Sequence, residues 1–248
     1  MTHVIPSAAM WHKDYQNLDA EKRKELAEVL QRLMQLLDAN SGGHCTFHDD
    51  LFVWFRNHFF TQDPRFVKAC GSLNSVLRAR LWRLYTLCWA MDQSPIDRGA
   101  IVDIGTYDGR ALEVALRYAE PRGLVMAYDL FDSPPEESRK RDHGPDLYEK
   151  VKERLKPWKA AVHMGDVTQL TWTFPERIAF AQIDLNCAEA EAKVFPAVYA
   201  RLVPGAVVVF DDYGFARYRD SALAHQAFLQ GKEQVLELPT GQGLLIKR

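Results

Sequence analysis

From Ala100 onward the chain alternates short apolar runs with helical stretches, and this alternation limits its possible folds more than any other feature. Short runs that are apolar throughout are typical of parallel strands buried on both faces of a sheet. Strands that alternate with helices predict an α/β domain built on such a sheet. The expected strands are Ala100–Ile104, Val125–Asp129, Ala160–Met164, Ala179–Leu185 and Ala206–Phe210.

The end of the chain has a different pattern. Gln234–Leu238 and Gly243–Lys247 are two further strand candidates, joined by Pro239-Thr240-Gly241-Gln242. A connection this short predicts an antiparallel hairpin. We therefore expect a Rossmann-like, seven-stranded sheet that is parallel except for its C-terminal hairpin. In such a sheet, ligands bind at the carboxyl ends of the strands, near the point where the strand order reverses.

Residues 1–97 are predicted to form a separate helical segment without strands, and residues 98–248 the α/β domain. Apolar residues from Leu26 to Leu37 recur at helical spacing, in a helix expected from Leu18 to about Asn40. A second helix is expected over Asn74–Met91. The apolar stripe of the first helix needs a partner surface, which a second copy in a homo-oligomer or the chain's own α/β domain can supply. The aromatic residues between the helices are expected in a core or an interface: Phe52, Trp54, Phe55, Phe59 and Phe60.

Charge and composition exclude several classes of protein. With 31 basic and 33 acidic residues the net charge is −2, which argues against nucleic acid as a partner. No apolar stretch approaches the ~20 residues of a membrane span, and the first residues do not resemble a signal peptide, so we expect a cytoplasmic protein. The four cysteines lack CxxC spacing, which argues against a zinc site and a disulfide framework.

The first expected strand leads into a loop with two glycines, Gly105 and Gly109, followed by a helical run. A glycine pair at this position suits either a plain turn or a loop around a nucleoside-containing ligand. The spacing is GxxxG, which is neither the GxGxxG of dinucleotide-binding proteins nor a phosphate-binding loop.

Two aspartates extend the nucleoside interpretation. Asp129 ends the second strand about 20 residues after the glycine loop, where a carboxylate can accept both hydroxyl protons of a ribose. Asp166 follows the third strand; its side chain can accept a hydrogen bond from an adenine amino group or cap a turn or helix, and both interpretations stay open.

Three more aspartates follow the fourth and fifth strands, which are expected to be neighbours. They are Asp184, Asp211 and Asp212. Carboxylates held close together raise each other's pKa unless a cation, a bound base or solvent compensates their charge. Oxygen ligands alone favour Mg²⁺ or Ca²⁺ over Zn²⁺.

Taken together, these segments resemble the class I S-adenosylmethionine-dependent methyltransferases, and among them the metal-dependent macrocin and mycinamicin O-methyltransferase branch. The resemblance covers roughly residues 98–248. The segments that carry it are Val102–Arg110, Asp129–Pro135, Gly165-Asp166, Asp184–Asn186 and Asp211–Gly214.

The resemblance implies a role for each matching residue. It assigns Asp184, Asp211 and Asp212 to Mg²⁺, and Asp184 or His143 to removal of the acceptor's proton. It also implies that residues 133–145 cover the site, while Asn186 replaces the aromatic residue usual in the family. The residues assigned to S-adenosylmethionine are Gly105, Thr106, Gly109, Asp129, Leu130, Asp166 and Val167.

The implied activity is methyl transfer to a hydroxyl of a small molecule, such as a sugar-bearing natural product or a similar diol. Bound to two adjacent oxygens, a divalent ion would orient the acceptor and stabilise its alkoxide. The alternatives are a nicotinamide-dependent oxidoreductase, a nucleic-acid methyltransferase and a non-catalytic protein that keeps the fold.

Overall fold

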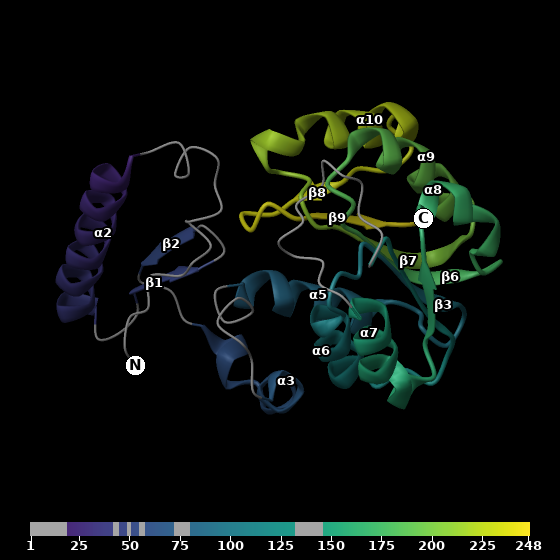
Figure 1. Ribbon diagram of the computed structural model, residues 1–248, viewed down its shortest axis with the longest axis horizontal. Coiled ribbons are helices and arrows are strands. Elements are labelled where there is room, and N and C mark those ends of the chain that lie inside the picture. Colours follow the sequence, from purple (N-terminus) through teal and green to yellow (C-terminus); the bar gives the residue numbers. More distant parts are fainter. Residues whose placement is uncertain (1–18, 42–44, 49–50, 55–57, 72–79, 132–145) are drawn as a thin grey trace. The chain divides into compact units, whose positions relative to one another are not determined.

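The computed structural model describes residues 19–41, 45–48, 51–54, 58–71, 80–131 and 146–248 (Figure 1). The chain divides into two compact units, Met1–Tyr85 and Thr86–Arg248.

The first unit contains the expected N-terminal helix, α2 (Ala20–Ser41). In this helix Leu26, Val29, Leu33 and Leu36 are between 37% and 56% exposed. These four side chains are therefore partly exposed within the described part of the chain, and the oligomer remains a prediction.

The prediction that residues 1–97 contain no strand was wrong. β1 (Cys45–His48) and β2 (Leu51–Trp54) form an antiparallel hairpin in which Cys45 lies opposite Trp54. The two segments hold Thr, Val, Phe and Trp, which favour extended backbone. Each strand has only four residues, too few for a clear alternation of apolar and polar positions.

Aromatic residues build a small core in the rest of this unit. η2 (Phe59–Gln62) leads into α3 (Pro64–Cys70), whose N-terminus is capped by Asp63. Phe60 is buried, with the rings of Trp82 and Tyr85 at 4.2 and 5.0 Å between centroids. Phe60 thus fits the expected core role, whereas Phe59 is 70% exposed. Of the other aromatics, Phe55 lies outside the described residues.

The second predicted helix is described from Leu81, as α5 (Leu81–Gln93), and it crosses the division between the units. The earlier part of that prediction, residues 74–79, lies outside the described residues.

The second unit is the predicted seven-stranded sheet, with the order β5-β4-β3-β6-β7-β9-β8. The first five strands are parallel, and β9 pairs with both β7 and β8 in antiparallel fashion. The strands are β3 (Ala100–Ile104), β4 (Val125–Asp129), β5 (Ala161–Met164), β6 (Ile178–Ile183), β7 (Leu202–Phe210), β8 (Leu236–Glu237) and β9 (Gly243–Ile246).

Helices cover both faces of this sheet (Figure 1). α8 (Val167–Leu170), α9 (Ala188–Tyr199) and α10 (Arg219–Leu229) lie on one face, and α6 (Arg110–Ala119) and α7 (Leu147–Leu155) on the other. Short 3₁₀ turns follow α7, α8 and the end of β7: η3 (Lys156–Trp158), η4 (Thr171–Thr173) and η5 (Ala216–Tyr218).

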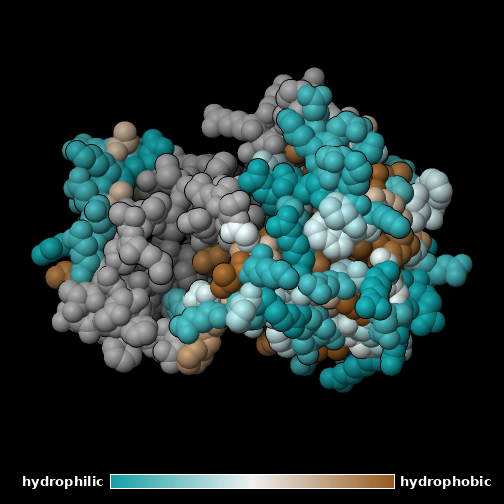
Figure 2. Space-filling model, turned by 90° about the horizontal axis from the view of Figure 1, so that it is seen from below, coloured by the Kyte–Doolittle hydropathy of each residue, from teal (hydrophilic) through white to brown (hydrophobic). Residues whose placement is uncertain are grey.

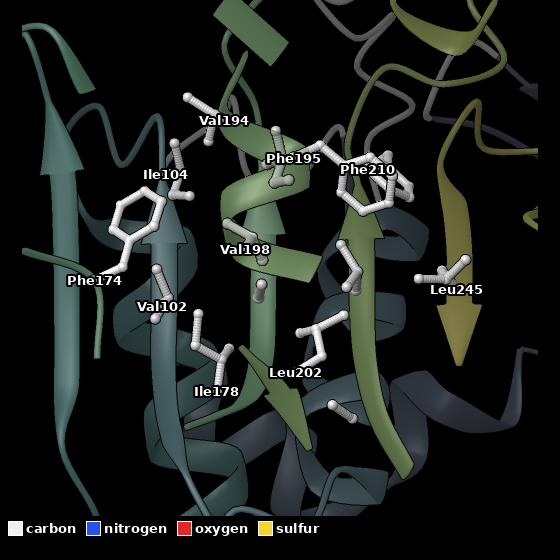
Figure 3. Close-up of a cluster of buried hydrophobic side chains, with 14 of the residues drawn as sticks. Val102, Ile104, Phe174, Ile178, Val194, Phe195, Val198, Leu202, Phe210 and Leu245 are labelled. Carbon is white, nitrogen blue, oxygen red and sulfur yellow. The ribbon is translucent and has the colours of Figure 1, made fainter. Parts of the chain in front are cut away.

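The larger core lies between the sheet and α9 (Figure 3). Val102 and Ile104 of β3 point toward α9, where Phe195 and Val198 are also fully buried. Because side chains alternate along a strand, Asp103 projects from the opposite face. The surface of this unit in Figure 2 is largely hydrophilic, with smaller groups of apolar side chains between. Within the described residues no helix is both long and apolar enough to cross a membrane.

Candidate functional site

The strand order reverses between β3 and β6. From β3 the chain continues outward through β4 to β5 and then returns to β6 on the other side of β3. Backbone hydrogen bonds continue to join neighbouring chain segments just beyond the ends of these strands. The Asp184 N–H donates to the Ile104 carbonyl over 2.8 Å. The Gly105 N–H donates to the Tyr128 carbonyl, also over 2.8 Å. Loops from three strands thus meet at the place where open α/β sheets bind ligands.

Gly105 lets two of these loops approach each other. Its φ is +86°, and a Cβ atom built on it would lie 1.8 Å from the backbone oxygen of Asp184. Any other residue would force this backbone apart. The glycine is therefore required by contact between the ends of β3 and β6, whether or not a ligand is bound.

Gly109, the second glycine of the loop, has a different neighbour. It precedes α6 with φ +73°, and an added Cβ would meet Val151 of α7 at 3.2 Å. α7 is also joined to α6 by an ion pair between Arg154 and Glu113 at 2.9 Å. The buried Thr106 hydroxyl between the two glycines donates to the Asp103 carbonyl over 3.2 Å.

Asp129 joins the end of β4 to the glycine loop. Its Oδ2 accepts from the Tyr107 N–H at 2.7 Å, and its Oδ1 from the Phe131 N–H at 2.9 Å. Both donors have positive φ, 51° for Tyr107 and 50° for Phe131, an uncommon conformation that tends to occur at functional sites. These two bonds fix the Asp129 carboxylate beside the glycine loop, and its contact with ribose hydroxyls stays a prediction. Leu130 beside it is half-buried.

Asp166 caps a helix. Its side chain accepts from the Thr168 N–H at 2.9 Å at the start of α8, and it is exposed, while Val167 is buried. The capping interpretation of Asp166 is observed, and its contact with adenine stays a prediction.

The three aspartates after β6 and β7 lie at the ends of adjacent strands, as the predicted topology requires. Each of the two nearest the sheet accepts from a side-chain amide: Asp184 from Asn186 at 2.8 Å and Asp211 from Gln242 at 3.0 Å. Asp212 is half-buried. Their oxygens are the type of ligand that Mg²⁺ prefers. However, the described part of the chain holds no group of three or more His, Cys, Asp or Glu side chains arranged to bind a metal ion.

Sequence reasoning missed Asp103, a buried carboxyl group on β3. The pKa of Asp103 is raised to about 7, mainly by burial and in smaller part by the neighbouring Asp129 and Asp211, while a hydrogen bond with Thr106 acts to lower it. Asp103 pairs in register with Gln182 of β6, which is also buried. The sequence signal for Asp103 and Gln182 was a polar residue inside an otherwise apolar strand. Such a residue is notable because burying a polar or charged group costs free energy.

His143, the second candidate base, lies outside the described residues. So does the whole segment 133–145 that was expected to cover the site.

Comparisons with known proteins agree with this geometry. Residues 102–213 match the family model described as "Methyltransferase domain". The matched segment contains the glycine loop, Asp129, Asp166 and the three aspartates after β6 and β7. No curated protein matches the chain in sequence.

Solved structures share the fold. The O-methyltransferase NovP is 15% identical with a TM-score of 0.55, over 89% of this chain and 98% of that chain. CalS11, a calicheamicin methyltransferase, is 19% identical with a TM-score of 0.56, over 77% and 93%. The O-methyltransferase TomG from Streptomyces achromogenes is 14% identical with a TM-score of 0.51, over 77% and 95%. At these identities the similarity establishes the Rossmann-like methyltransferase fold.

Proposed function

We propose that this protein is an S-adenosylmethionine-dependent O-methyltransferase that acts on a hydroxyl of a small molecule. The observation that carries the proposal is the bond between Asp129 and the Tyr107 N–H, which holds the glycine loop against a carboxylate suited to ribose. The match of residues 102–213 to a methyltransferase domain supports the choice of cofactor.

The proposed acceptor is a sugar-bearing natural product or a similar diol. The similarity to CalS11, described in one structure as a TDP-rhamnose 3'-O-methyltransferase, supports a sugar hydroxyl. The similarity to TomG, whose structure was solved with S-adenosylmethionine and which takes part in tomaymycin synthesis, supports both the cofactor and this class of product.

When bound, S-adenosylmethionine would supply a methyl group already activated on a sulfonium. The protein then has to align an acceptor oxygen with that carbon and accept the hydroxyl proton. We assign proton removal to Asp184, because it is half-buried at the point where the strand order reverses. His143 is the second candidate for this role.

Dependence on Mg²⁺ is a further part of the proposal, with Asp184, Asp211 and Asp212 as ligands. A bound divalent ion would orient two acceptor oxygens and stabilise charge on the reacting one. This part of the proposal is supported by the position of three carboxylates at the ends of adjacent strands. Carboxylate oxygens are the ligands that Mg²⁺ prefers. Asp184 and Asp211 each accept a hydrogen bond from a neighbouring side-chain amide, which would help to orient these two carboxylates toward the ion.

Calorimetry of the full-length protein with S-adenosylmethionine and with NAD tests the cofactor. Asp129→Ala should weaken S-adenosylmethionine binding at least tenfold, because it removes two charge-assisted hydrogen bonds of about 1.5–3 kcal/mol each. Asp108→Ala is the matched control, since it removes one charge from the same loop, where Asp108 pairs with Arg110. Binding of NAD in place of S-adenosylmethionine, or equal affinities for the wild type and Asp129→Ala, would reject the assignment.

Transfer of a labelled methyl group to TDP-rhamnose and to catechol, with and without a chelator, tests the chemistry. Chelation should abolish transfer and leave cofactor affinity nearly unchanged. Asp211→Asn and Asp212→Asn should reproduce this loss, whereas residues that only cap a turn would tolerate Asn. Full transfer in the presence of chelator would exclude the metal and leave Asp184 or His143 as a metal-free base.

A further inference from the structure

A glutamine of the C-terminal hairpin contacts Asp211 in the interior of the protein. Gln242 is 1% exposed and Asp211 is 8% exposed. The Gln242 Nε2 donates to Asp211 Oδ1 over 3.0 Å, although the two residues are 31 positions apart. A buried hydrogen bond to a charged group is among the stronger side-chain interactions in proteins.

The orientation of this amide is determined by a third residue. Thr240, itself 6% exposed, donates its hydroxyl to Gln242 Oε1 over 3.1 Å. The carbonyl end of an amide only accepts and the NH₂ end only donates. With its oxygen held by Thr240, Gln242 presents its NH₂ group to Asp211.

The hairpin tip is also attached to the loop that carries Asp211. Gly214 N–H donates to the Gly241 carbonyl over 2.8 Å. A Cβ atom on Gly241 would lie 2.3 Å from the ring of Phe215, and one on Gly243 would lie 2.7 Å from Tyr213. Figure 1 shows β9 directly beside β7, in agreement with their pairing. These contacts place Gln242 beside the end of β7.

We propose that Gln242 is a positioning residue that sets the orientation of Asp211 at the edge of the site, and that Thr240 sets the orientation of Gln242. This inference rests on the proposed function, in which Asp211 faces the methyl acceptor or its metal ion. A neutral donor suits this role because it anchors one carboxylate oxygen and leaves the negative charge of Asp211 in place.

Gln242→Leu in the full-length protein tests the proposal, and Gln226→Leu is its matched control. The Gln226 Nε2 donates to the hydroxyl of Tyr213 over 2.8 Å, so it anchors the same loop without touching a carboxylate. Crystal structures of both variants should show a changed Asp211 side-chain orientation in Gln242→Leu only. With TDP-rhamnose as the probe acceptor, kcat should fall at least tenfold in Gln242→Leu, while S-adenosylmethionine affinity stays within twofold.

A second pair of variants covers the case in which Gln242→Leu does not fold. Thr240→Val keeps the shape of the side chain and removes the hydroxyl, whereas Thr240→Ser keeps the hydroxyl. We expect Thr240→Val to alter Asp211 and lower kcat, and Thr240→Ser to restore both.

The proposal is overturned if Asp211 keeps its orientation in Gln242→Leu and Thr240→Val, or if Gln226→Leu loses as much activity as Gln242→Leu. A wild type that transfers no methyl group contradicts the proposed function instead. In that case the orientation of Asp211 in the crystal structures still decides the role of Gln242.

Discussion

Replacement of Gly105 by alanine should destabilise the second unit through two separate effects. Its φ of +86° is unfavourable for any residue with a Cβ atom, by about 1–2 kcal/mol. The new methyl group would also lie 1.8 Å from the backbone oxygen of Asp184, which has to move. Overpacking of this kind costs about 1–3 kcal/mol, so the expected total is about 2–5 kcal/mol.

Gly231→Ala separates the two effects. Gly231 has φ +77°, but no atom lies within 4 Å of the position of an added Cβ. This control should lose only the backbone contribution of about 1–2 kcal/mol. The difference between the variants therefore measures the contact between the ends of β3 and β6.

Urea unfolding of both full-length variants, followed by circular dichroism, gives the two losses in unfolding free energy. Thermal unfolding should agree, with a shift of about 2–4 °C for each kcal/mol in a unit of this size. Gly105→Ala should also weaken S-adenosylmethionine binding, while Gly231→Ala should not. If the two variants lose equal stability to within about 0.5 kcal/mol, the close approach of Gly105 to Asp184 does not constrain the fold.

Two further predictions concern buried charges. Because burial raises the pKa of Asp103 from 3.8 to about 7, the folded protein holds a proton that the unfolded chain releases between these values. Stability should therefore fall as pH rises from 3.8 to about 7, and Asp103→Asn should flatten this part of the profile measured by urea unfolding. Lys247 lies 3.2 Å from the buried Glu233, so Lys247→Met should lower the free energy of unfolding by about 1–3 kcal/mol. Lys156→Met breaks an exposed ion pair and should lower it by less than about 0.5 kcal/mol in the same assay. Equal losses in the two lysine variants would contradict the second prediction.

The α/β architecture of residues 98–248 could be predicted from the amino-acid pattern alone. Strands buried on both faces must be apolar along their whole length, and this local requirement is visible without knowledge of the fold. The predicted boundaries of β3 and β4 therefore agree with the structure. The same reasoning anticipated that β6 and β7 are neighbours, because connection rules leave few arrangements for alternating strands and helices.

The contacts of the site residues, in contrast, became visible only in the folded structure. Glycine is needed at position 105 because of the backbone of Asp184, which is distant in sequence. Likewise, Asp211 accepts a hydrogen bond from Gln242 in the C-terminal hairpin. Local patterns do not encode such contacts, because they depend on strand register and on side-chain rotamers selected by packing. The β1–β2 hairpin escaped prediction for a related reason: strands of four residues are stabilised mainly by their cross-strand partner, and their own pattern is too short to identify them.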